Sequence, residues 1–110
     1  KGARTVIAEP DGKISINPTG NPVLSSGGSG DVLTGLIGGF LARGWPPARA
    51  ACAGVYLHGL AADRLSEEMG QFGVLAGELL RVIPGLASSL TRGEWPLKQP
   101  PMEKDFYPPL

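Results

Sequence analysis

The 110-residue sequence predicts an α/β fold that forms one part of a larger domain. Residues 4–17 contain two short β-rich segments around the turn residues Pro10, Asp11 and Gly12, which predicts a β-hairpin. Three apolar segments of helical character follow. An apolar helix beside β-structure normally packs on a sheet, and two strands are too few to cover three such helices. We therefore expect the C-terminal piece of an α/β domain whose other strands precede Lys1.

The composition is that of a neutral globular protein. The formal net charge is zero at pH 7, which gives no reason to expect nucleic acid as a partner. Cys52 is the single cysteine, so an internal disulfide is excluded and a reducing compartment is indicated. No stretch approaches the ~20 apolar residues of a membrane span. We expect a cytoplasmic protein without a membrane partner, in which Cys52 is an inert, packed thiol.

The first helix is predicted over residues 30–43, with Ser29 as its N-cap and Asp31 in its first turn. Its large residues are apolar nearly all round, so we expect neighbours to cover it on more than one side. Gly35, Gly38 and Gly39 lie inside this helix, where each costs about 0.5–1 kcal/mol relative to alanine. These glycines predict a close backbone approach to a neighbouring element.

Two further helices complete the expected domain. An alanine-rich helix with an apolar stripe is predicted over residues 48–69. A third helix is predicted over residues 74–82, or on to the end of the domain with a kink at Pro84. Proline-rich, aperiodic sequence follows. We expect the domain to cover residues 1–90 and an extended tail to cover residues 91–110.

Residues 25–30 form a loop of serine and glycine that leads into the first helix beside Asp31. Backbone N–H groups at such a helix start, together with the helix dipole, favour an anion. Three glycine motifs are excluded, because a P-loop needs lysine at Asp31, a dinucleotide fingerprint needs glycine at Leu33, and a nucleophile elbow needs glycine at Asp31. Phosphoryl transfer remains, with the carboxylate as base. The alternative is an ordinary helix start with Asp31 matched to the dipole, and this pattern alone does not separate the two.

Four motifs occur together: SGGSGDVLTG at residues 26–35, TGNP at 19–22, KGARTVIA at 1–8 and YLHGLAADR at 56–64. With the helix near residues 74–80, they resemble one family, the ADP/ATP-dependent NAD(P)H-hydrate dehydratases. The resemblance covers about residues 1–90 and implies a ribokinase-like three-layer α/β/α fold. The sequence departs from the family pattern at two minor places. PVLSS at residues 22–26 replaces the more common Pro-Gly-Met/Leu-Ala-Thr/Ser, and Ala62 stands where glycine often precedes the aspartate.

The resemblance implies a role for each matching residue. Asp31 would be the catalytic carboxylate that acts on the C6 hydroxyl of the hydrated nicotinamide. This hydroxyl would be phosphorylated by ADP or ATP with Mg²⁺, and loss of phosphate would regenerate NAD(P)H. The glycine loop would hold the transferred phosphoryl group, and the start of the chain and the TGNP motif would line the nucleotide. The implied nucleotide-binding residues are Lys1, Gly2, Ala3, Arg4, Thr5, Asn21, Gly27, Gly28, Ser29 and Gly30.

The same resemblance implies partners. We expect an NAD(P)H-hydrate substrate, a homo-oligomer, and a preceding epimerase domain or a missing N-terminal half. Two alternatives stay open: another ribokinase-like kinase that phosphorylates a vitamin-precursor alcohol, and a non-catalytic fragment that binds a nucleotide.

The remaining polar residues receive ordinary structural interpretations. His58 is expected to be buried and hydrogen-bonded near the nucleotide site, because no second histidine or cysteine-rich set accompanies it. Asp63, Glu67 and Glu68 are expected to form a solvated helix face. No metal-ligating set is predicted.

Overall fold

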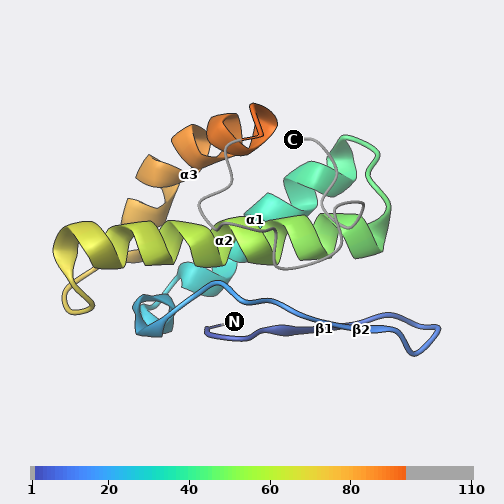
Figure 1. Cartoon of the computed structure of the whole chain (residues 1–110), viewed down its shortest axis with the longest axis horizontal. Helices are drawn as coiled ribbons and strands as arrows, with labels where there is room; N and C mark the ends of the chain where they lie inside the picture. Colours follow the sequence, from blue (N-terminus) through green and yellow to red (C-terminus); the bar gives the residue numbers. More distant parts are fainter. Residues whose placement is uncertain (1, 94–110) are drawn as a thin grey trace.

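The computed structural model describes residues 2–93 of the chain. Figure 1 shows a hairpin, a short 3₁₀ helix and three α-helices. In chain order the elements are β1 (Val6–Ala8), β2 (Ile14–Ile16), η1 (Pro22–Ser25), α1 (Ser29–Ala42), α2 (Pro47–Met69) and α3 (Ala76–Thr91). The predicted hairpin and helices are therefore confirmed to within a few residues at their ends. Lys1 and residues 94–110, most of the expected tail, lie outside the described residues.

The hairpin turns one apolar face outward. Strands β1 and β2 are antiparallel, with Ile7 opposite Ser15 and Val6 opposite Ile16. Ser15 is buried and Ile7 packs against the core, so this face of the hairpin lies toward α2. On the other face, Val6, Ile14 and Ile16 are 59%, 63% and 59% exposed. Nothing within the described residues covers these three side chains.

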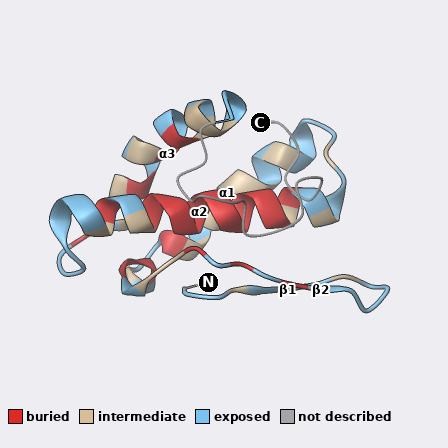
Figure 2. Ribbon diagram, in the orientation of Figure 1, coloured by how far each residue is buried: buried red, intermediate tan, exposed pale blue. Residues whose placement is uncertain are grey.

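Helix α2 is the central element. Every residue from Cys52 to Ala62 is buried, and Figure 2 shows this buried stretch between the hairpin on one side and α3 on the other, with α1 crossing behind it. Its small residues let neighbours approach closely. A Cβ at Gly54 would lie 2.6 Å from Ile37 Cγ1 of α1, and a Cβ at Gly59 would lie 2.7 Å from the carbonyl carbon of Thr19.

The described residues do not supply the cover on more than one side that the sequence predicts for α1. Ser29 is its one buried residue. Gly35, Gly38 and Gly39 are exposed, and a Cβ on any of them would meet nothing within 4 Å. The apolar composition of α1 did not reveal which helix is central. The glycines that permit close packing lie on α2 instead.

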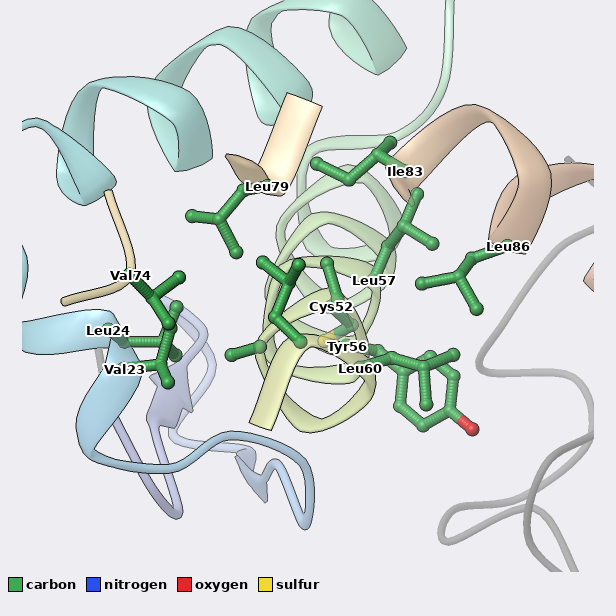
Figure 3. Close-up of a cluster of buried hydrophobic side chains, with 13 residues drawn as sticks. Val23, Leu24, Cys52, Tyr56, Leu57, Leu60, Val74, Leu79, Ile83 and Leu86 are labelled. Atoms are coloured by element: carbon green, nitrogen blue, oxygen red, sulfur yellow. The ribbon is translucent and has the colours of Figure 1, made fainter. Parts of the chain in front are cut away.

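Helix α3 packs along α2 and completes the core. It is one helix to Thr91, the longer of the two predicted alternatives, with Pro84 inside it. Pro84 has no N–H, so the Leu80 carbonyl lacks its usual helical hydrogen bond. Both residues are exposed. Figure 3 shows the buried cluster in which Leu79, Ile83 and Leu86 of α3 face α2.

Among the described residues, no helix has the length and apolar character needed to cross a membrane.

Candidate functional site

The glycine loop enters α1 through Gly28. Gly28 is the N-cap, with φ of 90°, a left-handed conformation that favours glycine. The prediction of Ser29 as the N-cap is wrong, because the entry turn needs the left-handed residue and places Ser29 inside the helix. The Ser29 hydroxyl instead donates to the Leu24 carbonyl over 2.6 Å. This bond ties the first residue of α1 back to η1.

Open backbone donors surround the start of α1. The N–H groups of Gly27, Gly28 and Gly30 meet no acceptor within residues 2–93, as expected where a helix begins. The Ser29 N–H donates to the Ser26 carbonyl over 3.2 Å, so it is used inside the loop. Of the four loop residues predicted to bind the nucleotide, the three glycines thus offer open N–H groups.

Asp31 stands in the first turn of α1, next to these donors. It is exposed, and its carboxylate has no hydrogen bond or ion pair within the described part of the chain. A carboxylate that is neither buried nor paired is available to accept a proton from a bound molecule. The predicted base and the predicted donors therefore lie together on one turn.

Hydrogen bonds of two side chains, Ser26 and His58, hold the glycine loop in place. Ser26 Oγ lies 2.8 Å from the Val23 carbonyl and 2.7 Å from the carbonyl of Val74, just before α3. His58 Nε2 of α2 lies 2.8 Å from the Ser29 carbonyl. Because a carbonyl only accepts, His58 Nε2 carries the hydrogen. The predicted burial and hydrogen bonding of His58 are confirmed, since its side chain is 1% exposed.

The TGNP motif forms a second loop, which is held by Asp63. Asn21 Oδ1 accepts from the Val23 N–H over 2.8 Å, and Asn21 Nδ2 donates to Asp63 Oδ1 over 2.9 Å. Asp63 Oδ2 also accepts from the Gly20 N–H over 3.2 Å. The prediction of a solvated Asp63 is therefore wrong, although Glu67 and Glu68 are exposed as predicted. Asp63 lies one helical turn after Gly59, on the buried face of α2. This four-residue spacing is the sequence feature that could have predicted a contact between Asp63 and the rest of the fold.

The start of the chain meets this second loop. Gly20 has φ of 112°, and a Cβ there would overlap the Gly2 carbonyl oxygen and lie 3.2 Å from Leu24 Cδ1. Gly2 and Asn21, both predicted to bind nucleotide, are thus brought near one another. Ala3 and Arg4 are exposed in the turn that precedes β1, where Arg4 has the left-handed φ of 58°. Thr5 begins the hairpin, and its carbonyl accepts from the Asn17 N–H over 2.8 Å.

A buried polar pair that the sequence did not reveal anchors the same loop to α2. Asn17 Nδ2 donates to Thr19 Oγ1 over 2.8 Å, and Thr19 Oγ1 donates to the Tyr56 carbonyl over 2.9 Å. Both side chains are 1% exposed. Their position in a proline-rich loop gave no sign of burial.

The buried thiol and phenol on α2 are neutral. Burial raises the pKa of Cys52 to about 11, and the Glu9 carboxylate adds to this shift. Burial likewise raises the pKa of Tyr56 to about 12, with a smaller contribution from Asp63. Cys52 is therefore protonated at neutral pH, in agreement with its predicted role as a packed thiol. Residues 2–93 contain no group of three His, Cys, Asp or Glu side chains that could hold a metal ion.

The hairpin, the glycine loop and the three helices define part of a ribokinase-like α/β domain, the fold of a class of nucleotide-using enzymes. The family model described as NAD(P)H-hydrate dehydratase matches residues 1–85, so the chain belongs to the NAD(P)H-hydrate dehydratase family.

Individual relatives agree with this assignment. The chain is 52% identical over 90 residues to the "Bifunctional NAD(P)H-hydrate repair enzyme Nnr" of Moorella thermoacetica, covering 82% of this chain and 17% of that protein. It is 47% identical over 93 residues to the "ADP-dependent (S)-NAD(P)H-hydrate dehydratase" of Neisseria meningitidis, covering 84% of this chain and 31% of that protein.

A solved structure shares the fold. The crystal structure of the ADP/ATP-dependent NAD(P)H-hydrate dehydratase from Bacillus subtilis, co-crystallised with ATP and Mg²⁺, matches with a TM-score of 0.76 and 44% identity. The match covers 80% of this chain and 32% of that chain. The chain thus spans about a third or less of the length of these relatives.

Proposed function

We propose that the protein to which this chain belongs is an ADP/ATP-dependent NAD(P)H-hydrate dehydratase, a hydro-lyase that restores NAD(P)H from (S)-NAD(P)H-hydrate. The observation that carries the proposal is the first turn of α1, where the exposed Asp31 lies beside the open N–H groups of the glycine loop. The names of the relatives from Neisseria meningitidis and Bacillus subtilis support the reaction.

Each part of this turn has a chemical role in the proposal. The N–H groups of Gly27, Gly28 and Gly30 stabilise charge on the transferred phosphoryl oxygens. Asp31 takes the proton of the C6 hydroxyl as the hydroxyl oxygen bonds to the terminal phosphorus of the nucleotide. The bond from this phosphorus to the bridging oxygen breaks, and AMP leaves from ADP, or ADP from ATP. The C6–O bond then breaks, phosphate leaves with the bonding electrons, and loss of a proton from C5 forms the C5–C6 double bond of the reduced nicotinamide. One aimed donor is worth about 2.7–4 kcal/mol, and a positioned base contributes roughly 10²–10⁴-fold.

The chain fits a nucleotide with its phosphates on the glycine loop. Open N–H groups at a helix start suit phosphate oxygens. We assign Lys1, Gly2, Ala3, Arg4 and Thr5 to the nucleotide as well, supported by the contact of Gly2 with Gly20. Both polar atoms of the Asn21 amide are engaged within the fold, so Asn21 contributes by shaping its loop. Ser29, with hydroxyl and N–H engaged, likewise contributes as an anchor.

Mg²⁺ completes the proposed site by neutralising phosphate charge when it is bound. The described residues supply no three-ligand set for it. We therefore assign Mg²⁺ binding to the nucleotide phosphates and to parts of the protein outside these residues. Asp31 is assigned to the substrate hydroxyl and not to the metal.

The wider organisation belongs to the same proposal. Residues 1–90 belong to the C-terminal part of the catalytic domain. Relatives named bifunctional support a preceding epimerase domain, and we also expect a homo-oligomer. The single, buried Cys52 supports a place in the cytoplasm.

A spectrophotometric assay tests the function. Full-length protein is incubated with (S)-NADH-hydrate, Mg²⁺ and either ADP or ATP. We expect the absorbance band of the reduced nicotinamide to return, with one nucleotide consumed per NADH formed. A phosphorylated product without that band would indicate a kinase instead. Nucleotide binding with neither signal would indicate a non-catalytic protein.

A further inference from the structure

A buried hydrogen bond connects α2 to the first turn of α1. His58 Nε2–H donates to the Ser29 carbonyl over 2.8 Å, and the side chains of the two residues are 1% and 0% exposed. On its other side, Ser29 is tied to η1 through its hydroxyl and the Leu24 carbonyl. Ser29 is therefore fixed from two directions, two residues before Asp31.

This end of α1 is also held by Val32, which packs against the core. Its N-cap, Gly28, has no side chain to cap the helix. Ser29 is the one buried residue of the helix, and the glycines further along it face open space. The orientation of the first turn thus depends on the hydrogen bonds of Ser29 together with the packing of Val32.

The hydrogen bond from His58 is additional to those that form the helix. A helical carbonyl already accepts from the N–H four residues on, and its second lone pair remains available. His58 uses this second position on the Ser29 carbonyl. Removal of the imidazole therefore leaves the helical hydrogen bond of this carbonyl intact, but frees the turn that carries Asp31 to shift.

We propose that His58 is a positioning residue, which aligns Asp31 and the glycine N–H groups through the Ser29 carbonyl. The inference rests on the proposed function, because it gives His58 a part in phosphoryl transfer without contact with substrate. Misplacement of a reacting group by about 1 Å can cost 10²-fold in rate, so a small shift of this turn is sufficient.

Two variants of the full-length protein separate positioning from packing. His58→Leu fills the space but donates no hydrogen bond, whereas His58→Gln offers an N–H at a similar reach. Cys52→Ala is the control, because Cys52 is equally buried on α2 but lies away from the glycine loop. For each variant, kcat and KM for ADP, the unfolding midpoint and amide hydrogen exchange over residues 28–32 are measured.

We expect kcat of His58→Leu to fall about 10- to 100-fold with faster exchange in this turn. His58→Gln should return kcat to within about threefold of wild type, and Cys52→Ala should lower the unfolding midpoint with kcat unchanged. Equal kcat in the Leu and Gln variants would overturn the proposal. If His58→Leu does not fold, His58→Gln with a tenfold loss of kcat and faster exchange would also overturn it.

A spectroscopic readout keeps this test separate from the proposed reaction. Long-range ¹H–¹⁵N spectra of the histidine ring, assigned by loss of the signal in His58→Gln, should show a hydrogen on Nε2. A ring without this hydrogen would contradict the inference even in an active enzyme. If wild type shows no dehydration, the proposed function fails, whereas the ring spectra and the hydrogen exchange still decide whether His58 holds the turn.

Discussion

At the scale of single residues, the site depends on one exposed carboxylate at a helix start. Asp31 has no partner within residues 2–93, and its turn is held from behind by Ser29. This arrangement separates two tasks. Ser29 fixes the position of the turn, and Asp31 and the glycine N–H groups remain available to a ligand.

Asp31→Asn tests the chemical part of this separation. The amide has nearly the same size but does not accept a proton as a carboxylate does. We expect kcat to fall by at least about 10²-fold, as for the loss of a general base. The dissociation constant for ADP, measured by calorimetry, should stay within about threefold of wild type, since the N–H donors are unchanged. Equal turnover in the two proteins would remove Asp31 from the mechanism.

Gly28→Ala tests the conformational part. A side chain at φ of 90° is strained, and its Cβ would also lie 3.4 Å from Ala76 Cβ. We expect a loss of about 1–2 kcal/mol in the free energy of unfolding, together with weaker ADP binding. Gly85→Ala, in an open position within α3, is the matched control and should gain about 0.5–1 kcal/mol. Similar effects of the two substitutions would contradict the role of the left-handed N-cap.

At the scale of elements, α2 supports both loops. Through His58 it contacts the glycine loop, and through Asp63 and the Tyr56 carbonyl it contacts the TGNP loop. The two loops are therefore set on one rigid helix, so their spacing follows from positions along α2.

Asp63→Asn tests this support. The carboxylate accepts from the Gly20 N–H and from Asn21 Nδ2, and an amide can present an oxygen to only one of these donors. We expect the free energy of unfolding, from urea titration, to fall by about 1–3 kcal/mol. Glu67→Gln, one turn later at an exposed position, should change it by less than about 0.5 kcal/mol. An equal, small effect of both would show that Asp63 is solvated, as its sequence context first suggested.

Gly59→Ala tests the close packing between α2 and the TGNP loop. The added methyl group would overlap Thr19 Oγ1 and lie 2.7 Å from the Thr19 carbonyl carbon, and the backbone there cannot move aside as a flexible side chain can. We expect a loss of about 1–3 kcal/mol from the resulting displacement. Gly54→Ala places a methyl group against the Ile37 side chain, so it should cost less. A larger cost at Gly54 than at Gly59 would contradict this packing.

At the scale of the whole molecule, the sequence predicted the elements better than their arrangement. Turn residues, helix periodicity and the Gly-Gly-Ser-Gly-Asp loop are local signals, and the structure confirms the elements that they predicted. Burial depends on contacts between distant segments. The apolar residues of α1 therefore predicted cover on more than one side, whereas the small residues of α2 are the buried ones among the described residues. The roles of Asp63 and Thr19 were missed for the same reason, because each hydrogen-bonds to a residue in another part of the chain.

The outward faces of the hairpin and of α1 are not covered by any of the described residues. Val6, Ile14 and Ile16 present apolar surface, and α1 has an open row of glycines. The relatives are about three times as long or longer, so a complete domain would offer further elements to both faces.

The central claim is that the first turn of α1 binds the phosphoryl group beside Asp31. A crystal structure of the full-length protein with Mg²⁺ and a non-hydrolysable ATP analogue tests it most directly. We predict phosphate oxygens about 2.7–3.2 Å from the backbone nitrogens of the glycine loop, with the Asp31 carboxylate facing the terminal phosphorus. A nucleotide bound with its phosphates away from residues 27–31 would contradict the claim.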